Sequence, residues 1–258
     1  MILDEYAIAE EILKKKHLTK SEDLFIAAKY LRREMKCDTL ETYAILNSIM
    51  VNSFSNFKPL NSATYLENMA LKAIEYDLKR IEEIKITTKE LNKILEVESS
   101  KQKRLLFTLL VYSKYYNELS SSNNNWCNIS ISELFRVSRV STRNNKEKAL
   151  MLCKLNNQGM IDFSRKNVNH NIKCLIVDES NKKIALGITD LRELGYQYIN
   201  IYDKTQFTYC AECGRIIKKD KKNDYSKKYC NECKQTMKNE QNLNRFQKLG
   251  KAYPLSDQ

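Results

Sequence analysis

Two pairs of cysteines constrain this chain more than any other feature of its sequence. Cys210 and Cys213 form one C-x2-C pair, Cys230 and Cys233 form a second, and sixteen residues separate the two pairs. Two residues between thiols allow a tight turn that directs both sulfurs toward one point. Gly214 follows the first pair and supplies a backbone without steric restriction. The pattern predicts one structural Zn²⁺ held by four thiolates.

The residues between the pairs favour a zinc ribbon over 206–235, with a strand at 215–219, a polar turn at 220–224 and a return strand at 225–229. Four unrelated thiols, a redox-active C-x-x-C and an iron–sulfur cluster are the alternatives. No thioredoxin-like βαβ pattern surrounds either pair. The chain has two histidines, both far from the pairs in sequence, so a catalytic zinc site is not evident.

The other four cysteines stand singly in apolar stretches: Cys37, Cys127, Cys153 and Cys174. The chain starts with an acidic segment before an apolar one, the reverse of a secretory signal, and no window approaches 18 uncharged apolar residues. We therefore expect no membrane association and a cytoplasmic location. In a reducing cytoplasm, single cysteines in apolar stretches are expected to be buried and structural.

Residues 1–98 are predicted to form a helical N-terminal domain, because apolar side chains recur there three and four residues apart. Asp38 followed by Glu41 has the spacing of a capping box, and residues 83–86 form a short strand-like run. This part of the chain has no catalytic constellation. We expect it to dock onto a protein partner or to dimerise.

Residues 101–190 have the element order of a winged helix-turn-helix domain. An apolar helix at 105–116 is followed by a loop, a short helix capped by Ser130, and a second helix that Ser138 or Ser141 is expected to cap. Gly159 is expected to close that second helix. Three strand-like runs follow at 160–164, 172–178 and 183–188, and the last two are predicted to pair as a hairpin.

In such a motif the second helix enters the major groove, where its first residues contact base edges. The segment that opens the predicted second helix is rich in side chains that bind guanine, adenine and phosphate. The wing is expected at 165–171. The predicted DNA contacts are Arg136, Arg139, Ser141, Thr142, Arg143, Asn144 and Lys146, with Arg165 and Lys166 from the wing.

The charge of the chain agrees with an anionic partner. Its 44 Lys and Arg exceed its 32 Asp and Glu, which gives a formal net charge of +12. Lysines also lie beside Tyr225 and Tyr229 in the predicted ribbon, a pattern that suits phosphate contact and base stacking. The basic tail at 236–258 is expected to be partly helical.

Several segments resemble an uncharacterised group of winged-helix and zinc-ribbon proteins from phages, prophages and mobile elements of low-GC Gram-positive bacteria. The resemblance extends over roughly residues 80–235. It is specific in the LGITDLRELGY segment and in the two cysteine pairs. It implies only a phage or mobile-element setting, in which such proteins commonly act on transcription or replication, and it carries no activity over to this chain.

Together these patterns predict a mainly α-helical protein with small β elements that binds double-stranded DNA without being an enzyme. No Gly-rich phosphate loop, G-x-S-x-G or H-E-x-x-H motif is present. The first alternative is an interaction module that binds a host protein such as polymerase or a defence component. The second is binding of single-stranded nucleic acid or RNA through the ribbon.

Overall fold

The computed structural model is mostly helical, with three small antiparallel sheets among the residues it describes. These residues are 3–18, 23–54, 56–120, 122–164, 171–180, 183–219, 228–238 and 241. The chain divides into two compact units. The first comprises Met1–Thr88, Lys114–Asn124 and Ser180–Leu191, and the second comprises Lys89–Ser113, Asn125–Glu179 and Arg192–Gln258. The α5 residues after Thr88 therefore belong to the second unit.

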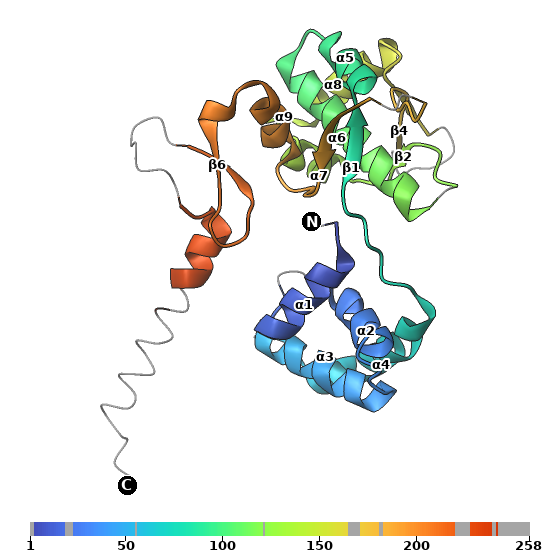
Figure 1. The fold of residues 1–258 in the computed structure, drawn as a ribbon, viewed down its shortest axis with the longest axis vertical. Coiled ribbons are helices and arrows are strands. Elements are labelled where there is room, and N and C mark those ends of the chain that lie inside the picture. The colour runs from blue at the N-terminus through green and yellow to red at the C-terminus, as the bar shows by residue number, and fades with distance from the viewer. Residues whose placement is uncertain are drawn as a thin grey trace. The chain divides into compact units, whose positions relative to one another are not determined.

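Four helices and a 3-10 turn make up most of the first unit (Figure 1). They are α1 (Glu5–Lys15), α2 (Leu24–Arg33), α3 (Thr39–Ser53), α4 (Pro59–Lys72) and η2 (Ala73–Glu75). Their apolar faces enclose a core in which Leu31, Leu46 and Leu66 are fully buried. The predicted capping box at Asp38 and Glu41 is confirmed, with both reciprocal hydrogen bonds present at the start of α3.

A buried ion pair lies at the edge of this core. Lys29 of α2, whose side chain is only 7% exposed, donates to the carboxylate of Glu5 and to the backbone oxygen of Asp77. Glu5 Oε2 also accepts from the backbone N–H of Lys79 at 2.8 Å. Each buried charge therefore has more than one hydrogen-bond contact, as a charge removed from water requires.

The first unit also contains a two-stranded sheet in which β1 (Ile84–Thr87) pairs with β5 (Ile184–Ile188). The strand predicted at 83–86 is confirmed, but the predicted hairpin between 172–178 and 183–188 is wrong. After β4 (Ile172–Cys174) the chain binds α5 (Thr88–Leu95), because the buried Glu90 accepts from Asp178 N–H and Lys89 pairs with the Asp178 carboxylate at 2.6 Å. Because the segment after β4 is bound to α5 in this way, β5 pairs with β1 and does not form a hairpin with β4.

The second unit is built around the first part of α6 (Ser100–Leu119), where side chains from Leu105 to Val111 are buried on all faces of the helix. Its other elements are β2 (Trp126–Cys127), α7 (Ile131–Val137), α8 (Asn145–Asn157) and β3 (Ile161–Phe163). The order of strands in the sheet is β2-β4-β3. The predicted buried helix is confirmed, and Gly159, with φ +69°, closes α8 as predicted.

The start of α8 differs from the prediction. Ser138 is buried at the end of α7, where its Oγ donates to Phe135 O, and Ser141 lies in the turn. Asn144 is the capping residue, since its side chain accepts from Glu147 N at 2.9 Å. The helix therefore begins four residues after Ser141, and residues 141–143 belong to the α7–α8 turn.

The C-terminal part of the second unit contains α9 (Leu194–Tyr202), η3 (Lys204–Gln206) and a hairpin of β6 (Phe207–Tyr209) with β7 (Ile216–Lys218). A helix at 231–238 follows. Across the described segments, no helix combines the length and the apolar character needed to cross a bilayer.

The four single cysteines differ in burial, and Cys37 is half-buried. Cys127 and Cys174 are buried in the three-stranded sheet, and burial raises the pKa of the Cys127 thiol. Cys153 is exposed, so the prediction that it is buried is wrong. The apolar side chains that anchor α8 are Leu152 and Leu155, and Cys153 lies on the other side of the helix.

These positions predict the reactivity of the thiols in the native protein. Cys153 is expected to react quickly with a maleimide, because it is exposed, whereas Cys127 and Cys174 should react only after the unit opens. Mass spectrometry of peptides after timed labelling measures each rate. Equal labelling of Cys153 and Cys174 would contradict the burial described above.

Candidate metal centre and basic face

The first cysteine pair lies in the loop that joins β6 to β7. Cys210 N donates to Arg215 O at 2.8 Å, and Gly214 N donates to Cys210 O at 2.9 Å, which closes a tight turn between the strands. Gly214 has φ +67°, the left-handed conformation that glycine adopts without steric cost. The hairpin thus presents both thiols on one side of its turn.

The second pair does not form an equivalent hairpin. Cys230 directly precedes the helix at 231–238, and Cys233 lies in the first turn of that helix. The predicted return strand at 225–229 is not found at Lys228 and Tyr229, and 225–227 lie outside the described residues. One hairpin turn and one helix start therefore supply the four thiols, in place of the two hairpins expected of a ribbon.

The four sulfurs form a compact cluster, and all four lie within 4.8 Å of one another. A tetrahedral Zn²⁺ with bonds of about 2.3 Å separates its sulfur ligands by about 3.8 Å. The distance between Cys213 Sγ and Cys230 Sγ is 3.8 Å. This spacing suits a single tetrahedral ion, whereas a cluster of several iron atoms holds its outer sulfurs further apart.

Backbone donors favour the charged form of one thiol of the cluster, that of Cys210. Burial disfavours the Cys210 thiolate, but backbone N–H groups, including that of Cys230 at 3.2 Å, lower the pKa of Cys210 to about 6. Burial and the neighbouring sulfurs raise the pKa of Cys233. A bound cation would offset the repulsion between neighbouring thiolates and so allow the other cysteines to ionise beside Cys210. The cluster therefore has the chemistry of a metal site.

An ion pair joins the two halves of the centre. Arg215, which follows the first pair, makes a bidentate contact with Glu232 of the helix at 231–238, with both distances 2.7 Å. Arg192 Nη2 donates to Cys213 O at 2.8 Å. The cysteine cluster is thereby connected to the segment that precedes α9.

Comparison of the chain with protein-family models, with curated proteins and with solved structures found no match to any of them.

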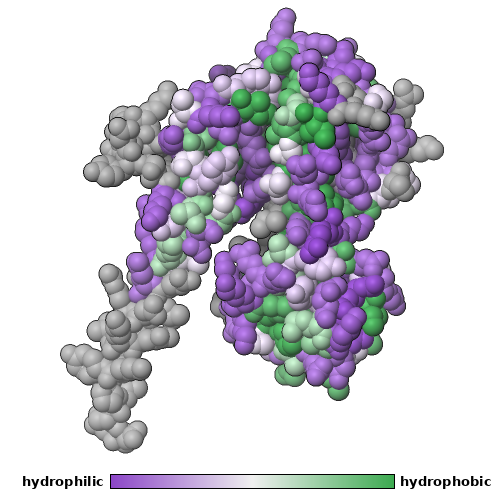
Figure 2. All heavy atoms as spheres, in the orientation of Figure 1, coloured by the Kyte–Doolittle hydropathy of each residue, from purple (hydrophilic) through white to green (hydrophobic). Residues whose placement is uncertain are grey.

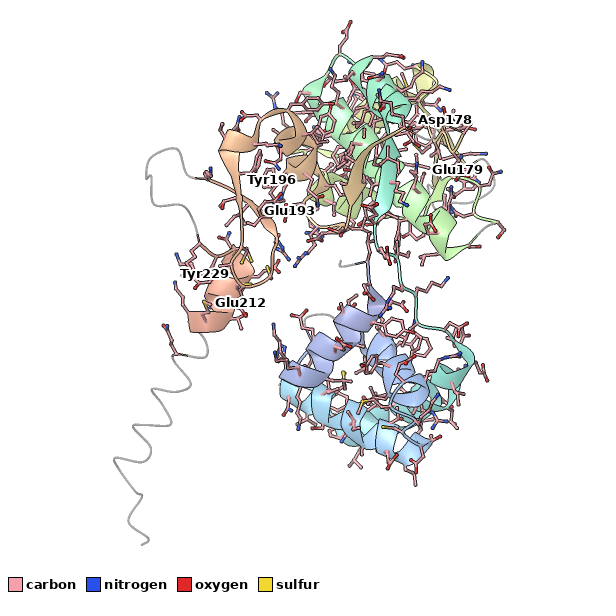
Figure 3. All side chains as sticks on the ribbon, in the orientation of Figure 1. Asp178, Glu179, Glu193, Tyr196, Glu212 and Tyr229 are labelled. Carbon is pink, nitrogen blue, oxygen red and sulfur yellow. The ribbon has the colours of Figure 1, made fainter. Side chains whose placement is uncertain are left out.

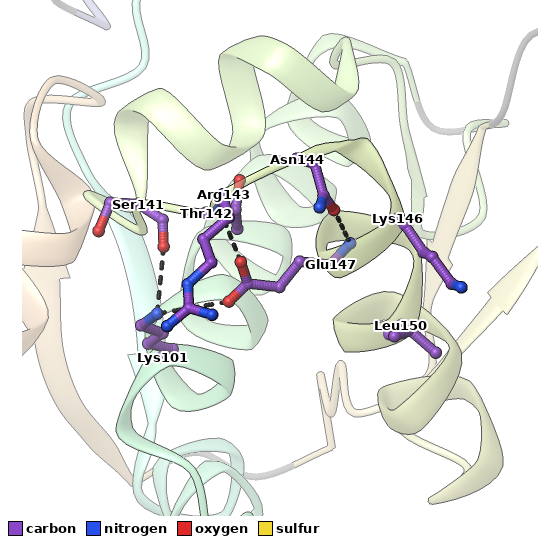
Figure 4. A pocket seen from close by; sticks show the side chains of 8 residues that line it. All are labelled: Lys101, Ser141, Thr142, Arg143, Asn144, Lys146, Glu147 and Leu150. Atoms are coloured by element: carbon purple, nitrogen blue, oxygen red, sulfur yellow. Dashed lines mark hydrogen bonds and ion pairs between the residues drawn. The ribbon is translucent and has the colours of Figure 1, made fainter.

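A hollow at the start of α8 brings together most of the predicted DNA contacts (Figure 4). Its lining residues are Lys101, Ser141, Thr142, Arg143, Asn144, Lys146, Glu147 and Leu150. Three of these are cations and one is a carboxylate. The side chains of Arg143, Asn144 and Lys146 are exposed, so this face is positively charged and accessible.

Glu147 organises the hollow from within. Its carboxylate accepts from Arg143 N at 2.7 Å and lies 3.6 Å from Lys101 Nζ, and the Arg143 backbone contact is the main cause of a lowered Glu147 pKa. Lys101 also donates to Ser141 O at 3.2 Å. Asn144 uses its side-chain oxygen to cap α8, so that oxygen is already engaged.

The remaining predicted contacts lie elsewhere. Arg136 pairs with Glu133 on the exposed side of α7, and Arg139 makes a bidentate contact with Glu193, so both charges are engaged within the protein. Arg165 and Lys166 lie outside the described residues. The structure does not bring Arg136 or Arg139 into the hollow.

Sequence analysis missed three residues that shape this face: Lys101, Glu147 and Arg104. Arg104 Nη1 donates to Arg139 O at 2.6 Å, so α6 holds the α7–α8 turn through two backbone oxygens. The pair Asn144 and Glu147 has capping spacing and could have been found in the sequence. The contacts of Lys101 and Arg104 span 35 to 40 residues and leave no local signal.

Proposed function

We propose that this protein binds double-stranded DNA through the start of α8 and the turn before it, and that its four-cysteine centre holds one structural Zn²⁺. The observation that carries the DNA proposal is the hollow, in which Arg143, Lys146 and Lys101 surround the beginning of a helix. Cations at a helix start attract phosphate, and the aligned backbone dipoles add to that attraction.

The order of elements supports the same proposal. A buried helix, a short helix, a turn, a second helix and a strand pair follow one another in the second unit, as in a winged helix-turn-helix domain. In that arrangement α8 is the recognition helix, while residues 165–170 of the predicted wing lie outside the described residues. The resemblance to phage and mobile-element proteins favours a regulator of transcription or replication.

Zinc is the proposed metal because the donor set consists of four thiolates with no position left for substrate. Such closed sites stabilise a fold. A single iron ion would use the same ligands, and elemental analysis separates the two.

A protein-binding function is the second candidate. The first unit exposes large apolar side chains, with Leu60 94% exposed and Leu40 77% exposed. Hydrophobic patches are visible among hydrophilic side chains on the drawn face of its helices (Figure 2). Exposed apolar residues of this size favour contact with another protein or a second copy.

The DNA proposal predicts distinct effects of two lysine substitutions on the same helix. Lys146→Ala, at the start of α8, is expected to weaken duplex binding, because it removes a cation from the hollow. Lys154→Ala removes the same charge two turns further along α8, one turn after Leu150 of the hollow, and should weaken binding less than Lys146→Ala does. Fluorescence anisotropy with a labelled duplex measures both.

The expected loss for Lys146→Ala is about five- to tenfold at low salt, with a shallower salt dependence. Arg143→Ala should also reduce discrimination between duplex sequences if it makes a bidentate base contact, at a cost of about 1–3 kcal/mol. Equal affinity of the parent, Lys146→Ala and Arg143→Ala proteins would overturn the assignment of this face and favour the protein-binding candidate.

A further inference from the structure

A buried carboxylate lies between the α7–α8 turn and the metal centre. Glu193, immediately before α9, is 3% exposed, and it makes a bidentate contact with Arg139 of the turn. Its Oε1 also lies 4.0 Å from Arg215 Nη1, beside the first cysteine pair. One carboxylate thus connects a cation of the turn with a cation of the metal centre.

The backbone at both ends of the Arg139–Glu193 contact is unusual. Arg139 has φ +53° and Glu193 has φ +56°, a region that residues other than glycine adopt only where the surroundings hold them. Gly195 lies so close to the turn that an added Cβ would stand 1.9 Å from Ser138 O. The turn and the segment before α9 therefore fit closely through their backbones.

Aromatic rings also connect the α7–α8 turn with the hairpin that carries the first cysteine pair. The Arg139 guanidinium stacks over the ring of Tyr196, 5.2 Å from its centre, and Figure 3 shows Tyr196 near Glu193 at the start of α9. Tyr196 in turn contacts Phe207 of β6, with 5.2 Å between ring centres. Phe207 is buried and lies three residues before Cys210.

A metal ion bound by the two cysteine pairs would hold Arg215 in its position beside Glu193. Arg215 belongs to the hairpin and Glu232 to the helix at 231–238, so an ion shared by the two cysteine pairs fixes the Arg215–Glu232 contact. Without the ion, the described contacts that hold the helix at 231–238 beside the hairpin are hydrogen bonds, such as that from Ala211 N to Lys228 O at 2.9 Å, and the Arg215–Glu232 pair itself. Arg215 would then be free to move away from Glu193.

We infer that Glu193 is a positioning residue that couples metal occupancy to the conformation of the α7–α8 turn. The metal centre holds Arg215, Arg215 and Arg139 hold Glu193, and Glu193 keeps the turn in the conformation that presents Arg143 and Lys146. The consequence for DNA rests on the proposed function, whereas the coupling itself is a property of the folded second unit.

Hydrogen exchange measures the coupling without DNA. The backbone N–H groups of Arg139 and Val140 donate to Arg136 O and Phe135 O, so their exchange rates report opening of the turn. In the full-length zinc-loaded protein, adding EDTA is expected to speed exchange at these two amides by about tenfold to a hundredfold. Amides in the buried part of α6 should stay protected, which shows that the unit remains folded.

Two variants interrupt the connection from opposite ends. Glu193→Gln and Arg215→Gln are both expected to keep one metal ion per chain, yet to show fast exchange at Arg139 and Val140 before EDTA is added. Glu133→Gln is the matched control, because Glu133 pairs with Arg136 on the exposed side of α7. It should behave like the parent.

Three results would overturn the coupling: no effect of EDTA on the turn amides of the parent, parent-like exchange in Glu193→Gln, or fast exchange in Glu133→Gln. Failure of the proposed function has another signature. A parent protein whose turn responds to EDTA, but which binds no duplex DNA in the loaded form, would refute DNA binding and leave the coupling supported.

Discussion

The Cys213→Ser variant is expected to lose its metal ion completely, and the segment 206–235 is expected to lose its fold at the same time. The sulfurs of Cys213 and Cys230 lie 3.8 Å apart across the cluster. Removal of the Cys213 thiolate therefore breaks the metal-mediated link between the hairpin and the helix at 231–238. Metal binding contributes about 10–16 kcal/mol in small zinc domains at neutral pH, more than a hairpin and one helix can replace.

Elemental analysis and hydrogen exchange together measure this result. The parent should contain one zinc per chain, and Cys213→Ser or Cys230→Ser should contain none. Cys153→Ser is the matched control, because Cys153 is exposed on α8 and should be neutral for metal content. A parent without metal, or with iron and a visible absorption band, would contradict a zinc centre.

Replacing Lys29 with methionine is expected to destabilise the first unit by about 3 kcal/mol, the lower end of the range for breaking a buried ion pair. The substitution keeps the length of the side chain but leaves the Glu5 carboxylate without its cation. Glu5 is only 21% exposed, so water compensates little, although the Lys79 N–H remains as a donor.

The exchange rates of core amides, such as that of Leu46, give the opening free energy of this unit in the full-length protein. Lys15→Met is the control, since Lys15 pairs with Glu11 on the helix surface and should change stability by less than about 0.5 kcal/mol. Equal effects of the two substitutions would show that the Lys29 pair contributes no more than a surface pair.

Local sequence patterns predicted the elements better than their pairing. The buried α6, the strand β1, the Asp38 cap and the turn at Gly214 all follow from residues within a few positions of one another. The partner of β5 was not predictable in this way, because β1 lies about 100 residues earlier. The contact of Asp178 with Glu90, which separates β4 from β5, is equally distant in sequence.

In the candidate sites, too, local patterns predicted the residues but not their contacts with residues distant in sequence. Two C-x2-C pairs predicted the cysteine cluster, yet not that a helix start supplies its second half, because the residues after Cys233 give only weak helical periodicity. The basic residues before α8 were found from their composition. The engagement of Arg139 by Glu193, 54 residues later, depends on a backbone fit at Gly195 that no local pattern indicates.

The most direct test of the account is the affinity of the zinc-loaded protein for duplex DNA measured as a function of salt. If Arg143 and Lys146 each neutralise one phosphate, the logarithm of the association constant should fall against the logarithm of salt concentration with a slope of about −2 or steeper. Failure to bind duplex DNA at low salt, or binding without dependence on salt, would contradict the account.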